Sequence, residues 1–236
     1  MSNYLFSCEN ATYAVPADFA GLFSGHREVL ACSEGWEPGA LNLAQAMAMR
    51  FHTPLVHSET SRLLLNVEVS REQCWSRFSV DLDPSDQRRL IERYWQSYRS
   101  QLHRRIEADL ARHGFVYHIM VHTDPDQQDL VELHTPKGAT LSLELSEAWL
   151  AALKRDDLKC RCRTQSGESN LSRELAQQRD PDQYAQIRLS VHQDFFLMGA
   201  PWRWNTIKKH VLDALAISAS RLKPESQSRP SNFLER

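Results

Sequence analysis

The chain has 236 residues, of which 42% are hydrophobic and 25% are charged, and its formal net charge is -2. A chain of this length can bury a sizeable core, and this composition is ordinary for a globular protein. The small net charge argues against electrostatic capture of nucleic acid or of an anionic membrane surface, so we expect neither as a partner.

The five cysteines have neither the CxxC spacing of a redox motif nor a zinc-ribbon pattern. Their odd number favours reduced thiols, as in cytosolic proteins, over a disulfide framework. The first residues lack a basic region followed by an apolar run, and no stretch reaches about 18 apolar residues. We therefore expect a cytoplasmic protein that is neither exported nor anchored in a membrane.

Short apolar runs and helical spacings alternate along the first third of the chain. Residues 4–8 predict a first strand that ends in two polar residues. Apolar residues at helical spacing predict a helix over residues 39–52. Residues 54–57 and 63–69 indicate two further strands, and the apolar first half of the second is typical of a strand covered on both faces.

A long helix is predicted next. Asp83 or Ser85 can cap its start, with Pro84 in the first turn, and Gly114 suits a left-handed cap at its end. An apolar stripe runs along the segment between them, as expected of a helix that covers a core. Residues 115–122 then combine β-branched and aromatic types, which predicts a central strand.

Two histidines in this central strand have different expected roles. On a helix, His118 and His122 could share one metal ion, but in a strand they lie roughly 13 Å apart, at about 3.3 Å per residue. In open α/β sheets, ligands bind outside the carboxyl ends of the strands. His122, followed by Thr123 and Asp124, is therefore the functional candidate, and we interpret His118 as a core histidine.

The second half of the chain continues the alternation. We expect a hairpin formed by residues 130–133 and 139–145, and a disordered polar tail over residues 223–236. The whole pattern predicts an α/β fold: a three-layer sandwich with a mostly parallel or mixed central sheet, in a single domain over residues 1–222. The other expected elements are a helix over 146–155, a strand over 158–163, a helix over 169–178, a strand over 186–193 and a helix over 204–222.

Polar side chains gather at the predicted strand ends and in the loops beside them. A metallohydrolase needs about three histidine or carboxylate ligands and an open position for water, and an arginine can clamp a substrate carboxylate. No HExxH, GxSxG or GxGxxG motif is present. The candidate site residues are Glu9, Asn10, Glu37, Arg62, Asn66, Glu68, His122, Asp124 and His192.

Several ordered segments resemble the N-formylglutamate amidohydrolase family. They run through most of residues 6–126 and include SCENATYAVP, GWEPGALNLAQAMA, SRLLLNVEVS, YWQSYRSQLHRRI and HIMVHTDP. The resemblance implies a zinc-exopeptidase-like (phosphorylase/hydrolase-like) α/β fold, a zinc cofactor, and hydrolysis of the carbon–nitrogen amide bond of a small N-acyl amino acid or similar carboxylate. It implies zinc binding by Glu37, His122 and Glu9, catalysis by Arg62 and Asp124, and substrate binding by Asn10, Arg62, Asn66 and Glu68.

The chain departs from the family pattern at several positions. A neutral amide in place of a histidine is a weak zinc donor, and losing a carboxylate base slows proton transfer by roughly 10²- to 10⁴-fold. Glu9 and Glu68 could complete a shifted metal site. The departures are Asn10 for a histidine, Asn66 for an aspartate, Val69 for an arginine and Ser190 for a glutamate.

Three hypotheses follow for the function. The first is a metal-dependent amidohydrolase with altered ligands. The second is a catalytically degenerate relative that keeps the fold as a ligand-binding or partner-binding module, because the substitutions lie in separate motifs that would meet at one site. The third is a likeness of fold alone, with a site elsewhere that uses Cys8 or Cys32.

Overall fold

The computed structural model describes residues 3–126, 130–154, 158–165, 169–197 and 201–221. Within them, a six-stranded sheet has the order β2-β1-β3-β6-β4-β5. β4 is antiparallel to β6, the other neighbouring pairs are parallel, and the sheet is therefore mixed. The strands are β1 Tyr4–Cys8, β2 Leu55–His57, β3 Val116–Asp124, β4 Val131–Pro136, β5 Cys160–Gln165 and β6 Tyr184–His192.

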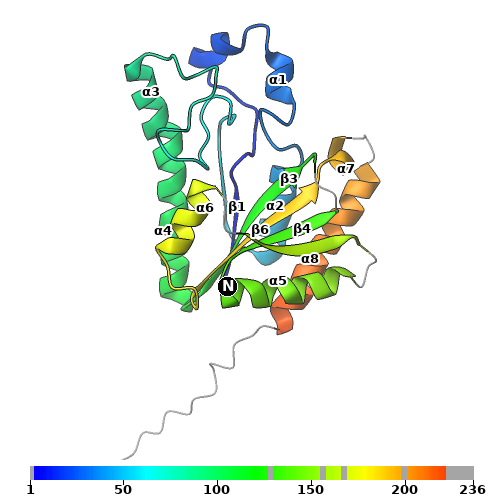
Figure 1. Cartoon of the computed structure of the whole chain (residues 1–236). Helices are drawn as coiled ribbons and strands as arrows, with labels where there is room; N and C mark the ends of the chain where they lie inside the picture. Colours follow the sequence, from blue (N-terminus) through cyan, green and yellow to red (C-terminus); the bar gives the residue numbers. More distant parts are fainter. Residues whose placement is uncertain (1–2, 127–129, 155–157, 166–168, 198–200, 222–236) are drawn as a thin grey trace, which may run out of the picture.

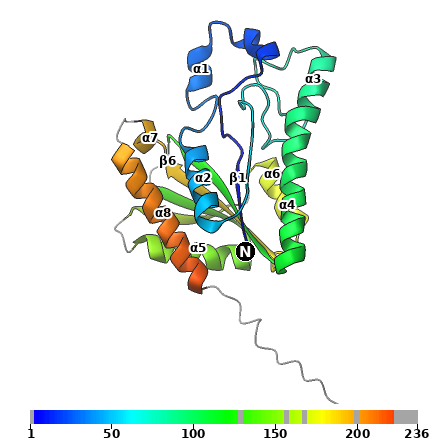
Figure 2. The same cartoon turned by 180° about the vertical axis from the view of Figure 1, so that it is seen from behind.

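Helices cover both faces of this sheet (Figures 1 and 2). α2 Ala40–Phe51, α5 Thr140–Leu153 and α8 Pro201–Arg221 pack over one apolar cluster, whereas α4 Ser97–His113 and α6 Asn170–Gln177 cover another on the opposite face. The expected three-layer α/β arrangement is confirmed. The shorter helical elements are η1 Ala17–Phe23, α1 Arg27–Ala31, α3 Pro84–Leu90, the π-helical segment η2 Ile91–Gln96, and α7 Asp194–Leu197.

The long helical segment begins and ends as its sequence predicts. The Asp83 carboxylate accepts a hydrogen bond from the Ser85 backbone N–H at 2.8 Å, and Pro84 occupies the first turn. Gly114 ends α4 with φ of 75°, in the left-handed region. The π-helical η2 immediately precedes α4, whose second residue, Tyr98, takes part in the site below.

The predicted strand over residues 63–69 is wrong. Leu64 and Leu65 are buried, but their backbone N–H groups donate to the Ser61 carbonyl in a tight turn. The carbonyls of Val67 and Val69 accept from the Arg99 side chain on α4. The Arg99 side chain and local turns thus supply the backbone hydrogen bonds that pairing with a neighbouring strand would have supplied.

The predicted hairpin is also wrong in its second half. Residues 139–145 do not form a strand: Ala139 is the N-cap of α5, and α5 begins at Thr140 and includes the rest. Leu145, Trp149 and Leu153 are fully buried and lie four residues apart, which is a helical spacing. The helix expected over residues 146–155 therefore begins earlier than predicted. β4 instead pairs with β6 and β5.

The other expected elements are present within a few residues of their predicted limits. None of the five cysteines, all of which lie in the described residues, forms a disulfide, as expected. In the described part of the chain, no helix has the length and apolar character needed to cross a membrane. The predicted tail over 223–236 lies outside the described residues, and the single domain over 1–222 stays a prediction.

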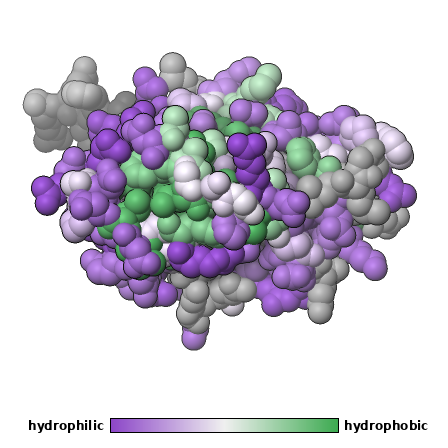
Figure 3. Space-filling view, turned by 90° about the horizontal axis from the view of Figure 1, so that it is seen from above, coloured by the Kyte–Doolittle hydropathy of each residue, from purple (hydrophilic) through white to green (hydrophobic). Residues whose placement is uncertain are grey.

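The end of the molecule that carries α1 and the start of α3 has a mixed surface. Seen from this end, an apolar area is bordered by hydrophilic residues (Figure 3). β1, β3 and β6 run parallel, so their carboxyl ends lie at one edge of the sheet, where ligands bind in open α/β folds.

Candidate functional site

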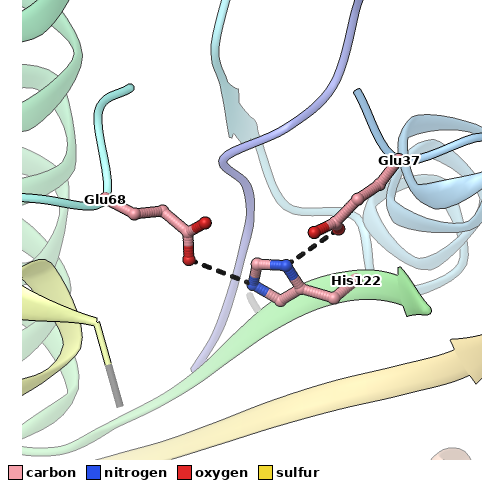
Figure 4. A group of neighbouring side chains, drawn as sticks. All are labelled: Glu37, Glu68 and His122. Atoms are coloured by element: carbon pink, nitrogen blue, oxygen red, sulfur yellow. Dashed lines mark hydrogen bonds and ion pairs between the residues drawn. The ribbon is translucent and has the colours of Figure 1, made fainter. Parts of the chain in front are cut away.

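Five polar side chains converge in the interior at the carboxyl ends of β1 and β3. Glu9 and Asn10 directly follow β1, and His122 lies near the end of β3. Glu37 precedes α2, and Glu68 comes from the irregular segment under α4 (Figure 4). All five are buried. Buried charged groups require partners, so the contacts among them decide what this site can do.

Glu37 is carried toward His122 by a sharp turn into α2. Gly39 has φ of 91°, and a side chain there would also approach Phe196 and Trp204 to 3.1 Å, so this turn requires glycine. Thr123 fixes the turn from β3, because its hydroxyl donates to the Pro38 carbonyl at 2.9 Å.

His122 stands between carboxylates. Its Nδ1 lies 2.9 Å from Glu37 Oε2, and its Nε2 lies 3.2 Å from Glu9 Oε2 and 4.0 Å from Glu68 Oε1. Burial and the nearby Arg188 oppose a charge on the ring, but the contacts with Glu37 and Glu9 outweigh them and raise the pKa of His122 to about 10. Without a bound cation, the imidazole therefore carries a proton at neutral pH.

Asn10 joins two of the carboxylates. Its amide nitrogen donates to Glu37 Oε1 at 2.9 Å and to Glu68 Oε2 at 2.8 Å. Its side-chain oxygen, Oδ1, is buried and has no hydrogen-bond partner. The residue therefore takes part in the cluster through a neutral amide.

The cluster has the donor set of a metal centre. Among the described residues, ligand atoms of Glu37, Glu68 and His122 all lie within 4.8 Å of one another. Glu9 Oε2 and His122 Nε2 face each other at 3.2 Å as an ion pair, but neither makes a hydrogen bond, and Asn10 Oδ1 is buried without one. Such atoms can accept an ion or water between them. One imidazole and two carboxylates leave room for further ligands on a divalent ion such as zinc. The residues fit such an ion, and the third member of the set is Glu68, one of the two glutamates that we expected could complete a shifted site.

Glu9 is anchored on the side away from His122. Its Oε1 accepts hydrogen bonds from Tyr98 at 2.6 Å and from Ser7 at 2.7 Å. Burial by itself would raise the pKa of Glu9, but the contacts with His122, Tyr98 and Ser7 lower it to about 2. Glu9 thus supplies a fixed negative charge beside the imidazole.

His118 supports this anchor from the core. Its Nε2 lies 2.8 Å from the Ser7 hydroxyl and its Nδ1 lies 2.7 Å from the Tyr184 hydroxyl. Because the Ser7 hydroxyl donates its proton to Glu9, His118 Nε2 must donate to Ser7. Burial lowers the pKa of His118 to about 4. The predicted role as a core histidine is confirmed.

We expect His118 to make the fold sensitive to acid. Between pH 6.5 and 4 the unfolded chain binds a proton at this residue and the folded chain does not. The free energy of unfolding should therefore fall by about 3 kcal/mol as the pH decreases through this range. Urea unfolding of wild type and His118→Gln would measure it, with the exposed His57→Gln as the control. Identical pH slopes for wild type and His118→Gln would contradict the assignment.

A hollow of about 360 Å³ opens beside the cluster. Glu37 forms part of its wall, which connects the hollow to the buried carboxylates. Two arginines, Arg62 and Arg188, bring positive charge to the same wall, and the side chain of each is 27% exposed. Asp124, Asp126 and Gln193 line it as well. The hollow is therefore a route by which a small polar ligand can reach the cluster.

The two arginines are held differently. Arg62 Nη1 lies 3.5 Å from Glu37 Oε1, while its other guanidinium nitrogens donate to the carbonyls of Ser33 and Glu34. Arg188 rises from the middle of β6, and its Nη1 lies 3.3 Å from Glu68 Oε1. Each guanidinium thus faces one of the converging carboxylates.

The structure brings together most of the residues expected from the sequence. Arg62 and Asp124 lie at the hollow, next to the cluster. Asn66 instead uses its side-chain oxygen to accept from the Glu68 backbone N–H at 2.9 Å, which shapes the segment that carries Glu68. The late-strand His192 is half-buried at the end of β6 and does not line the hollow, as far as the described residues show.

Sequence reasoning missed Arg188, Gln193 and Tyr98 as parts of the site. A signal for the first was present: Gln186, Arg188 and Ser190 alternate as polar residues in a strand between two others. Polar residues at every second position of a central strand place a polar row on one covered face. Tyr98 lies within the apolar stripe of a long helix, so nothing local distinguished it.

Comparison with known proteins points to one family. The sequence model described as N-formylglutamate amidohydrolase matches residues 2–165. A crystal structure of a gene product from Agrobacterium tumefaciens superposes with a TM-score of 0.75 at 18% identity, covering 94% of this chain and 91% of that one. N-formylglutamate amidohydrolase from Ralstonia eutropha JMP134 gives 0.69 at 14% identity, with 93% of each chain covered. These two structures share the fold. Among curated proteins, none matches the sequence.

Proposed function

We propose that this chain, which belongs to the N-formylglutamate amidohydrolase family, hydrolyses the carbon–nitrogen bond of an N-acyl amino acid. A divalent metal ion, zinc in the first place, would assist the reaction. The observation that carries the proposal is the convergence of Glu37, Glu68 and His122 beside an open hollow, of which Glu37 forms part of the wall. Buried carboxylates beside an open hollow are typical of a reaction centre and are unnecessary for packing.

Glu37, Glu68 and His122 would hold the ion. When bound in such a site, zinc polarises a carbonyl group and acidifies water. A ligating imidazole is neutral and keeps one N–H, so one of the contacts of His122, with Glu37 or with Glu9, would remain as the support that sets the geometry of the ring.

Arg62 and Arg188 would bind the substrate carboxylate. Both guanidinium groups reach the hollow, and each also contacts a carboxylate of the cluster. Guanidinium groups suit carboxylates because their donors form a planar fork. In our proposal Arg62, which is tied to the carbonyls of Ser33 and Glu34, also keeps that loop against Glu37.

The charges of the site agree with an anionic substrate. Glu9, Glu37 and Glu68 are balanced by the two arginines and the His122 imidazolium when no metal is present. A divalent ion would displace the His122 proton, because only neutral imidazole ligates a metal. The loaded cluster would then carry one excess positive charge, which a substrate carboxylate neutralises.

The test is hydrolysis of a set of N-formyl amino acids, including N-formyl-L-glutamate, by protein loaded with one equivalent of zinc. We expect saturable release of the free amino acid by wild type and a loss of at least about 100-fold for His122→Ala. The variant should be loaded identically and checked for folding by circular dichroism. Equal rates for the two proteins, or no turnover by wild type, would rule out the proposal.

One observation favours a second function, a ligand-binding module without catalysis. The Asn10 amide already donates to both Glu37 and Glu68, and Arg188 contacts Glu68, so the cluster has internal partners without a metal. This alternative predicts less than about a tenth of an equivalent of metal after purification without chelator, and binding of N-acyl amino acids without turnover.

A further inference from the structure

Gln193 has a buried oxygen that lacks a donor. The residue is 1% exposed, its side-chain Oε1 has no hydrogen-bond partner, and it lines the hollow beside the cluster. Its backbone N–H donates to the Asp124 carbonyl at 3.2 Å, so the two residues are joined where β3 and β6 end. A buried carbonyl oxygen at the wall of an open hollow is suited to accept an N–H from a ligand.

Carboxylates line the same hollow as this oxygen. Asp124 and Asp126 line the same hollow, and Asp124 Oδ1 accepts from the Asp126 backbone N–H at 2.9 Å, which fixes the first carboxylate in place. Glu34 also lines the hollow, but it forms an ion pair with Arg77. The segment after β3 and the end of β6 thus present one unsatisfied acceptor and two negative charges.

The rest of the lining limits the ligand further. Apart from Pro125, every residue that lines the hollow is polar or charged, and a volume of about 360 Å³ is at the small end for a ligand pocket. A long apolar acyl group would find no matching surface there. The ligand should be small and should carry groups of both charges, since the lining combines arginines with carboxylates.

We propose that Gln193 and Asp124 form a subsite for an ammonium or guanidinium group of the substrate. This inference rests on the proposed function and names the substrate class: a short-chain N-acyl derivative of a basic amino acid. Its carboxylate would face Arg62 and Arg188, and its cationic side chain would donate to Gln193 Oε1 and to the Asp124 carboxylate.

A matched set of substrates tests this subsite. N-formyl-L-lysine and N-formyl-L-norleucine have side chains with the same four methylene or methyl carbons and differ by the ammonium group, and N-formyl-L-glutamate reverses the charge. For zinc-loaded wild type we expect kcat/KM for the lysine derivative to exceed that for norleucine by about tenfold or more, with glutamate poorest.

Variants distinguish the loss of this subsite from a general loss of activity. Gln193→Leu should lower kcat/KM for the lysine derivative by about tenfold and leave norleucine within about twofold, and Asp124→Asn should lower the ratio of kcat/KM for lysine to that for norleucine by about tenfold. Asp180→Asn is the matched control, because Asp180 makes the same turn contact, with the Asp182 backbone N–H, away from this hollow. Asp124→Asn retains an oxygen for its own turn, so it keeps the test valid if Gln193→Leu does not fold.

The outcomes distinguish this inference from the proposed function. A preference for glutamate, or losses in Asp124→Asn that are equal for lysine and norleucine, would overturn the subsite while hydrolysis stands. If the loaded protein hydrolyses none of the three, the proposed function fails, and equilibrium binding of the same compounds decides the subsite. Tighter binding of the lysine derivative that is lost in Asp124→Asn supports it, and equal or undetectable binding of all three overturns it.

Discussion

A His122→Ala variant without metal should lose about 3–5 kcal/mol of folding free energy at pH 6. The change removes the buried cation that lies between Glu9 and Glu37 and leaves their charges, with that of Glu68, in the interior. The raised pKa of His122 means that its charge contributes full stability below pH 6.5 and that this contribution is lost as the pH rises toward 10. The largest difference from wild type is therefore expected at or below pH 6.5.

Urea unfolding in the presence of chelator measures this loss. The exposed His57→Ala is the control for removal of an imidazole from a strand near the site, and it should change the unfolding free energy by no more than about 0.5 kcal/mol. A loss below about 1 kcal/mol for His122→Ala would contradict an imidazolium between the carboxylates.

Metal binding at neutral pH should release about one proton for each ion bound. Without metal, the pKa of His122 is about 10, so the ring is protonated at pH 7, and it must become neutral to ligate an ion. Each unit of pH below 10 should therefore weaken the metal affinity by about tenfold, and the affinity should rise with pH between 6.5 and 8.5.

Calorimetric titration in buffers with different ionisation enthalpies counts the released protons. His118→Gln is the matched control, since this histidine lies in the same strand, has a lowered pKa and is outside the cluster. The control should give the same proton count as wild type. An affinity that does not change with pH, together with no proton release, would mean that metal binds without His122.

The sequence alone predicted those site residues that lie at the carboxyl end of a recognisable strand. His122 follows from a buried central strand and from the rule that ligands bind at carboxyl ends, and Glu9 and Asn10 follow from the first strand. Glu68 was a candidate, but the way it reaches the site could not be predicted, because it comes from a segment whose path depends on Arg99 and on turns around Ser61.

Contacts that depend on long-range packing were harder to predict. Gln193 and Asp124 are neighbours because β3 and β6 pair in a register that no local pattern specifies. The missed start of α5 has a similar cause: residues 139–145 contain apolar types found in both helices and strands, and packing of Leu145 and Trp149 decides between them. Long-range packing therefore limited both the fold prediction and the site prediction.

Anomalous diffraction at the zinc absorption edge, from crystals grown with zinc and without chelator, tests the metal centre most directly. The account predicts one strong peak bounded by Glu37, Glu68 and His122, and no peak there in crystals of His122→Ala. Zinc-grown crystals that show no peak among these three residues, with His122 still in contact with Glu9 and Glu37, would contradict it.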